Sequence, residues 1–138
     1  MNLQNIPIKA VIEEGYSIGS LRALLTEITV MLERLARDRT IGSIALNSLP
    51  FAPGEYEQLR QMLGQGEVSA RIEAIGPSEV VETRYPGVWW VTHYNVEGDI
   101  VADTIEITSL PEILKSQPED INAGLELLRS QLNGEVQQ

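Results

Sequence analysis

Apolar positions in the first third of the chain follow a helical period. Six leucine and isoleucine residues recur at the spacing of one helix face: Leu21, Leu24, Leu25, Ile28, Leu32 and Leu35. This stripe predicts an amphipathic helix over about residues 19–38, with Ser17 or Ser20 as a cap at its start. Before it, residues 6–12 are compatible with a brief strand or an extended arm.

A second, shorter helix is predicted after a connection over residues 39–52. Pro53 suits the first turn of a helix, and Glu55 and Glu57 would lie near the positive end of the helix dipole. Four side chains form the apolar face: Tyr56, Leu59, Met62 and Leu63. Gly64 is expected to end this helix.

From residue 67 the apolar period changes from helical spacing to alternation, which predicts β-strands. The expected strands span residues 67–75, 79–85, 87–96 and 99–108, and Gly- and Pro-containing turns separate them. Because the connections are short, neighbouring strands should be antiparallel and form a four-stranded meander.

The last part of the chain returns to a helical pattern. Residues 109–112 match a capping box, and Pro118 begins a longer helix that ends at Gly134. Its apolar stripe comprises Ile121, Leu125, Leu128 and Leu132. The predicted fold class is therefore α+β: a four-stranded antiparallel meander sheet with helices packed on one face, in a single domain of residues 1–138.

Composition narrows the possible chemistry. The chain has no cysteine and a single histidine, His93, which excludes disulfides, thiol nucleophiles and Cys- or His-rich metal sites. It also lacks a Gly-rich phosphate loop, a nucleophile elbow and an EF-hand loop. We therefore expect neither a cofactor nor a metal. No secretory signal or apolar run of about 20 residues is present, so a cytoplasmic location is the expectation.

Charge narrows the possible partners. The net charge of −10 disfavours nucleic acids and anionic lipids. It favours a basic partner, unless it serves solubility alone.

The stretch 85–95 concentrates the aromatic side chains and contains both tryptophans and the histidine. In a strand, Trp89 and Trp90 point to opposite faces. Trp89 shares its face with His93 and Asn95, whereas Trp90 shares its face with Tyr94. The first face is the more polar, so Trp89 and His93 are predicted to be accessible. The alternative is that one tryptophan lies in the core, the other lies under a helix or in a dimer contact, and His93 is structural.

Asp103 and Glu106 interrupt an otherwise apolar strand. Their separation places them on opposite faces, so they cannot act together as two catalytic carboxylates. Outward-facing charges, or bonds to Arg71 or Arg84, are expected.

Several local sequences together resemble a known family. They are Leu49-Pro50-Phe51, Gly64-Gln65-Gly66-Glu67-Val68, Pro86-Gly87-Val88-Trp89-Trp90-Val91, Tyr94-Asn95, Asp103-Thr104-Ile105-Glu106-Ile107 and Leu110-Pro111-Glu112. In this order they resemble the C-terminal region of the HupH/HyaF hydrogenase expression/formation proteins, most clearly over residues 41–130.

The resemblance implies a non-catalytic, chaperone-like accessory factor in the maturation of nickel–iron hydrogenase. Its expected partner is the hydrogenase small-subunit precursor, which carries a twin-arginine export signal, or another maturation protein. Candidate partner-binding residues are Trp89, Trp90, His93, Tyr94, Asn95, Asp103 and Glu106. The alternative is a general interaction module that forms a homodimer through a sheet edge or the first helix. A small enzyme is the third possibility, which a polar pocket containing His93 would favour.

Overall fold

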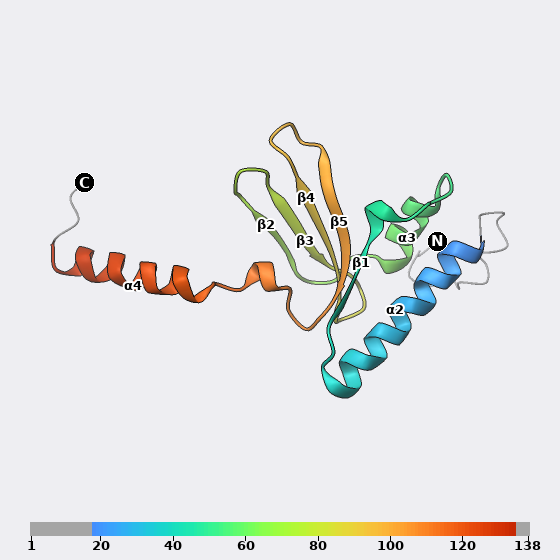
Figure 1. Cartoon of the computed structure of the whole chain (residues 1–138), viewed down its shortest axis with the longest axis horizontal. Helices are drawn as coiled ribbons and strands as arrows, with labels where there is room; N and C mark the ends of the chain where they lie inside the picture. The colour runs from blue at the N-terminus through green and yellow to red at the C-terminus, as the bar shows by residue number, and fades with distance from the viewer. Residues whose placement is uncertain (1–17, 135–138) are drawn as a thin grey trace.

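The computed structural model describes residues 18–134 as one antiparallel sheet with two packed helices and a projecting C-terminal helix (Figure 1). The helices are α2 (Ile18–Asp38), α3 (Glu55–Leu63) and α4 (Pro118–Leu132), with short 3₁₀ turns η2 (Leu46–Ser48) and η3 (Glu112–Leu114). The strands are β1 (Gly42–Ala45), β2 (Ser69–Ile72), β3 (Ser78–Glu82), β4 (Val88–Tyr94) and β5 (Ile100–Ile107).

The sheet contains the predicted meander and one additional strand. Its order is β1-β5-β4-β3-β2, and every neighbouring pair is antiparallel. The α+β class is therefore confirmed, but four strands is wrong. The fifth strand, β1, pairs with β5 through a contact far apart in sequence, with Gly42 opposite Ile107. Because β1 has only four residues, with Ile44 buried, its alternation is too short to predict a strand.

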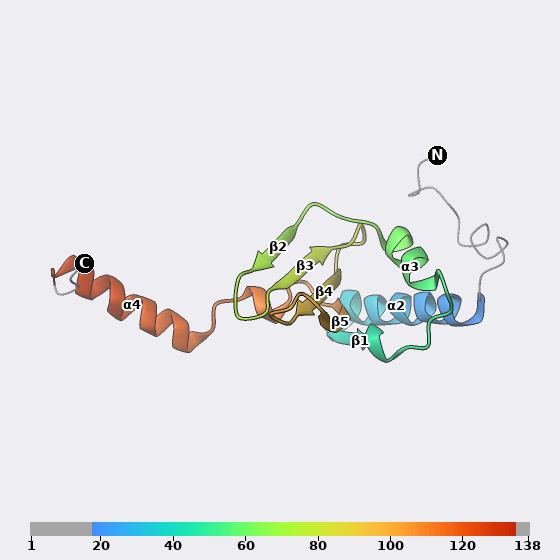
Figure 2. The same ribbon diagram turned by 90° about the horizontal axis from the view of Figure 1, so that it is seen from above.

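Helices α2 and α3 cover one face of this sheet, which we call the helix face (Figures 1 and 2). The predicted stripe of α2 lies against it, and Leu24 is only 5% exposed. Leu59 of α3, Trp90 of β4 and Ile105 of β5 complete the same core. The helix predicted over residues 19–38 is thus confirmed, whereas the possible cap Ser17 and the arm at residues 6–12 lie outside the described residues.

A buried glutamate joins the two helices of the helix face. Glu55, the first residue of α3, accepts hydrogen bonds from the Ala52 backbone N–H at 2.6 Å and the Ser20 hydroxyl at 2.9 Å. Ser20 therefore links α2 to α3 instead of capping α2. Gly64, with a φ of 64°, ends α3 as predicted, because a residue with a Cβ rarely adopts this conformation.

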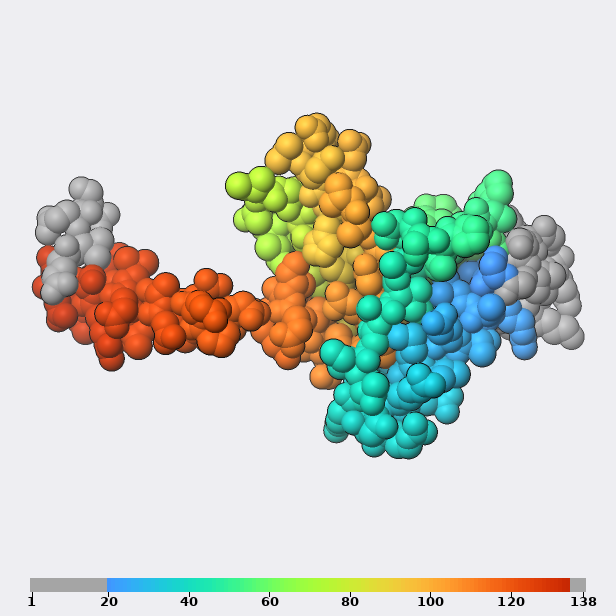
Figure 3. Space-filling model, viewed as in Figure 1, coloured from blue at the N-terminus to red at the C-terminus, as the bar shows by residue number. Residues whose placement is uncertain are grey.

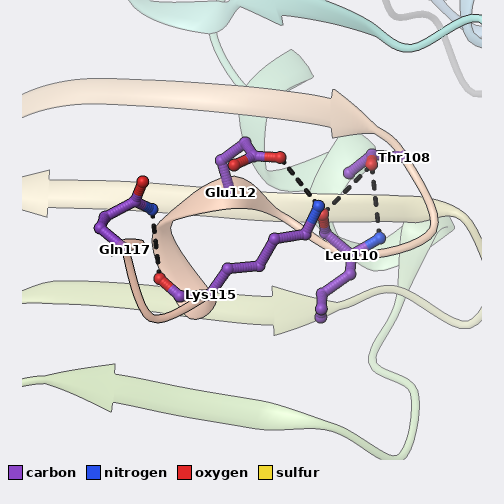
Figure 4. Close-up of polar contacts among 5 residues, drawn as sticks. All are labelled: Thr108, Leu110, Glu112, Lys115 and Gln117. Atoms are coloured by element: carbon purple, nitrogen blue, oxygen red, sulfur yellow. Dashed lines mark hydrogen bonds and ion pairs between the residues drawn. The ribbon is translucent and has the colours of Figure 1, made fainter. Parts of the chain in front are cut away.

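The opposite face of the sheet, which we call the far face, is covered by the segment that follows β5. This segment, residues 108–117, folds back over the strands and places Leu114 of η3 against Trp89 and its neighbours. Local bonds fix its path (Figure 4): Thr108 Oγ1 pairs with Leu110, and Lys115 Nζ lies 2.8 Å from Glu112.

Helix α4 then leaves the body of the molecule (Figures 1 and 3). All of its side chains are exposed except that of Ser130, which is half-buried. The expectation that the C-terminal helices pack with the first helix on one face is therefore wrong: η3 lies on the far face and α4 packs on neither. The sequence shows that α4 has an apolar stripe, but not what covers it.

Candidate protein-binding surfaces

Asp103 is the centre of a buried polar cluster on the helix face. It is 3% exposed, and its Oδ1 accepts hydrogen bonds from Trp90 Nε1 at 2.7 Å and Thr92 Oγ1 at 2.8 Å. The sheet register produces this arrangement, because Thr92 lies directly opposite Asp103. Tyr56 of α3 donates its hydroxyl to the second carboxylate oxygen. The prediction of an outward-facing Asp103, or of a bond to Arg71 or Arg84, is wrong, since three neutral donors satisfy this carboxylate.

Aromatic packing reinforces the cluster. The Tyr56 ring meets Trp90 edge-to-face at 5.5 Å between centroids, and the Arg60 guanidinium lies 4.6 Å from the centre of the Trp90 ring. Burial, followed by the bond to Asp103, raises the pKa of Tyr56, so its hydroxyl remains a donor at neutral pH. This cluster fastens α3 to the sheet: Trp90, Thr92 and Asp103 are buried within it, whereas Tyr56 is half-buried and Arg60 is exposed.

The two tryptophans lie on opposite faces of β4, as alternation predicts, and both are buried. Trp90 is 3% exposed on the helix face, and Trp89 is 4% exposed on the far face. Trp89 packs with Val80, Val91 and Leu114, and its Nε1 donates to the Thr108 carbonyl at 3.0 Å. The prediction that Trp89 is accessible is therefore wrong, because the segment 108–117 closes over it. Strand alternation identifies the two faces but not a loop that returns to one of them.

His93 pairs with a serine that the sequence motifs did not indicate. Ser78 lies opposite His93 in the register, and its Oγ is 2.6 Å from His93 Nδ1. Ser78 is only 6% exposed, which closes this hydroxyl to a substrate. The pair is a contact between neighbouring strands, which agrees with the alternative that His93 has a structural role.

Tyr94 and Asn95 make contacts near the end of the β4–β5 hairpin. The Tyr94 hydroxyl donates to Glu79 at 2.8 Å, and this bond, with some burial, raises the pKa of Tyr94. The Asn95 side chain accepts from the backbone N–H groups of Glu97 and Asp99 and thereby fixes the turn. Both side chains are half-buried.

Glu106 lies on the far face, opposite Trp89 in the register, and is half-buried. Burial raises the pKa of Glu106, and the nearby Glu112 carboxylate adds to the rise, while His93 lowers it. Leu110 and Ile113, on the same returning segment, are 41% and 40% exposed. We use the name acidic–apolar patch for the interacting carboxylates Glu106 and Glu112 together with Leu110 and Ile113, which lie on the same segment as Glu112.

An apolar groove lies between α2 and α3 on the helix face and has a volume of about 250 Å³. Most of its wall comes from side chains of the two helices: Leu25, Ile28, Thr29, Leu32, Met62 and Leu63. Arg84, Tyr85 and Val88 close one side. We call it the α2–α3 groove. The periodicity of α2 predicted a buried stripe but not this opening.

Within residues 18–134, no cluster of histidine and acidic side chains is arranged to hold a metal ion. In the same part of the chain, no helix combines the length and apolar character needed to cross a membrane. The notable features are thus two surfaces, the patch and the groove, and the stripe of α4.

Comparison with known proteins identifies the family of this chain. Residues 19–134 match the family described as HupH hydrogenase expression protein, C-terminal conserved region. The chain belongs to this family, as the resemblance in the sequence indicated.

Individual relatives agree with the family match. The chain is 32% identical over 90 residues to the hydrogenase expression/formation protein HoxQ of Azotobacter vinelandii. The aligned stretch covers 65% of this chain and 32% of that protein. It is 35% identical over 78 residues to the hydrogenase expression/formation protein HupH of Rhodobacter capsulatus. Here the aligned stretch covers 56% of this chain and 28% of that protein. The match thus spans about a third of the length of these curated relatives.

A solved structure shares the fold. The hydrogenase expression protein HupH from Thiobacillus denitrificans superimposes with a TM-score of 0.80 at 37% identity. The superposition covers 84% of this chain and 97% of that one.

Proposed function

We propose that this chain is a non-catalytic accessory factor in the maturation of nickel–iron hydrogenase and binds a protein client in the cytoplasm. Its membership of the HupH family supports the process, because its relatives are named hydrogenase expression/formation proteins. The client that we propose is the hydrogenase small-subunit precursor, with another assembly protein as the alternative.

The observation that carries the proposal is the acidic–apolar patch. Glu106 is partly buried near a second carboxylate, Glu112. Burial is the main cause of its raised pKa, His93 lowers that pKa, and Glu112 adds a smaller repulsion. A cation from a partner would relieve that repulsion. Glu112 is paired with Lys115, but both side chains are largely exposed, so this pair contributes little and a partner can replace it.

The chemistry of the patch fits a basic segment with an adjoining apolar stretch. Arginine binds carboxylates through two parallel hydrogen bonds, and exposed Leu110 and Ile113 supply apolar contact next to them. The net charge of −10 would favour the approach of such a segment. A twin-arginine signal, with paired arginines and an apolar stretch, has this composition.

The buried candidates take an indirect part in this proposal. Trp89 supports the patch from beneath, because it packs against Leu114 of the returning segment. Trp90 and Asp103 hold α3 to the sheet on the helix face. His93, Tyr94 and Asn95 are half-buried and stay candidates for the edge of the interface.

The proposal is tested by titrating purified small-subunit precursor, with and without its signal, into the full chain. We expect a complex whose affinity falls at least 10-fold when Glu106 and Glu112 are both changed to Gln, because two carboxylates are lost. The matched control changes Glu27 and Glu33, which are exposed on α2, to Gln and removes the same charge.

Rising salt should weaken the complex, and deletion of the signal should abolish it. Equal binding of the precursor lacking its signal, or equal losses in the two double variants, would contradict the role of the patch.

A further inference from the structure

Helix α4 has an apolar stripe that no part of the described chain covers. The stripe is Ile121, Leu125, Leu128 and Leu132, which are 57%, 45%, 65% and 85% exposed. These residues recur at the spacing of one helix face. The helix begins at Pro118, a residue that suits the first turn of a helix. A helix of this length is marginal in water without a partner, so its regular structure implies a surface against which it packs.

The α2–α3 groove is the converse case, an apolar surface that no other part of residues 18–134 fills. Leu25 and Leu32 of α2 and Met62 of α3 line it and are only partly buried. A smaller hollow over Arg22, Leu25, Thr26 and Thr29 continues it along α2. Together they give α2 a path along which another helix can lie.

The groove is out of reach of α4 in the same molecule. Leu114 is anchored on the far face, and only residues 115–117 separate it from Pro118. Those residues span at most about 14 Å when extended. The groove lies on the helix face, whereas the anchored Leu114 lies on the far face, and α4 points away from α2 and α3 (Figures 1 and 2). Any partner of α4 at this groove must therefore be another molecule.

We propose that α4 of one copy lies in the α2–α3 groove of a second copy, and reciprocally, so that two chains form a two-fold, helix-exchanged dimer. The described part of one chain carries both a helix without a groove and a groove without a helix, which is the requirement for a self-complementary two-fold contact. The inference goes beyond the proposed function, and it stands or falls without a client.

Charge and size support a second copy as the occupant. The charged side chains that line the groove and its continuation are arginines, Arg84 and Arg22. Helix α4 carries Glu119, Asp120 and Glu126 against a single arginine. Two exchanged helices of this length bury on the order of 1,600 Å² in total, the size of a standard stable interface.

Engineered cysteines give a direct test, because the chain has none of its own. Leu128→Cys and Thr29→Cys are made in separate full-length chains, which are mixed and oxidised under mild conditions. We expect a disulfide-linked pair that contains one chain of each kind. If Leu128→Cys chains cross-link to each other with equal or greater yield, α4 pairs with α4 and the groove assignment is wrong.

Solution size provides an independent measurement. By light scattering at about 50 µM, we expect a dimer for the natural chain and a monomer for Leu128→Glu, which places a charge in the contact. Thr29→Arg, on the exposed rim of the groove, should weaken the dimer at least 10-fold. The matched control Ala23→Arg, exposed elsewhere on α2, should leave it unchanged. A natural chain that is monomeric at this concentration overturns the proposal.

Discussion

Helices α2 and α4 have the same kind of sequence and opposite surroundings. Each has a stripe of leucine and isoleucine at helical spacing. In α2, Leu24 and Ile28 are each 5% exposed against the sheet, whereas in α4, Leu128 is 65% exposed. An amphipathic pattern therefore establishes that a face needs a partner, and the path of the chain decides whether that partner lies within the molecule.

The path differs because different segments anchor the two helices. A short connection over residues 39–41 links the end of α2 to β1, which pairs with β5, so α2 is held over the helix face. The segment before α4 is instead fixed to the far face by Leu114 and by the bond from Trp89 to Thr108. The same stripe thus becomes core in one case and, on our account, an interface between molecules in the other.

The largest expected effect tests how firmly the buried Asp103 cluster holds α3 on the helix face. Asp103→Ala leaves the Trp90 indole, the Thr92 hydroxyl and the Tyr56 hydroxyl without their buried acceptor. We expect the free energy of unfolding to fall by about 3–5 kcal/mol in a urea titration. Asp99→Ala, at the exposed hairpin, is the control and should change it by less than about 0.5 kcal/mol. A similar small loss for Asp103→Ala would mean that the buried cluster does not fasten α3.

The comparison of the two stripes is tested by the same truncation in each. Leu24→Ala should lower the free energy of unfolding by about 2–5 kcal/mol, because it leaves a cavity in the core. Leu128→Ala should lower it by less than about 0.5 kcal/mol at a dilution where the chain is monomeric. At high concentration it should also lower the melting temperature, because the dimer is weakened. Equal losses from the two truncations in dilute solution would show that α4 packs within its own molecule.

The smallest expected effect concerns Glu106 on the far face. The pKa of Glu106 is raised in the folded state, so the folded protein holds the carboxyl proton more tightly than the unfolded chain does. The charged carboxylate therefore lowers the stability once the pH exceeds the ordinary glutamate range. Glu106→Gln should therefore raise the free energy of unfolding at about pH 7, by less than about 0.5 kcal/mol because the group is half exposed. The gain should disappear as the pH falls to about 4. A stability loss at neutral pH would contradict the assigned environment.

Much of the fold follows from local patterns in the sequence. The stripe of α2, the alternation of β3–β5 and the left-handed Gly64 each act within one element, so they can be interpreted without knowledge of contacts. β1 escaped prediction because its pairing with β5 is distant in sequence and its four residues are too few to show a period.

The candidate site was harder to predict for the same reason. Alternation placed Trp89 and Trp90 on opposite faces, and the separation of Asp103 and Glu106 placed those two on opposite faces as well. Whether each side chain is exposed depends on what lies above it. Tyr56 reaches Asp103 from α3, and Leu114 covers Trp89 from a returning segment, and neither contact has a signal in the local sequence.

Hydrogen exchange of the α4 backbone amides at two protein concentrations tests the account most directly. With α2 as the internal reference, we expect α4 amides to exchange rapidly at about 1 µM and to become protected at about 200 µM, because α4 gains its groove only in the dimer. The α2 core amides should stay protected at both concentrations. Equal exchange of α4 at the two concentrations would contradict the claim that its partner is a second copy of this chain.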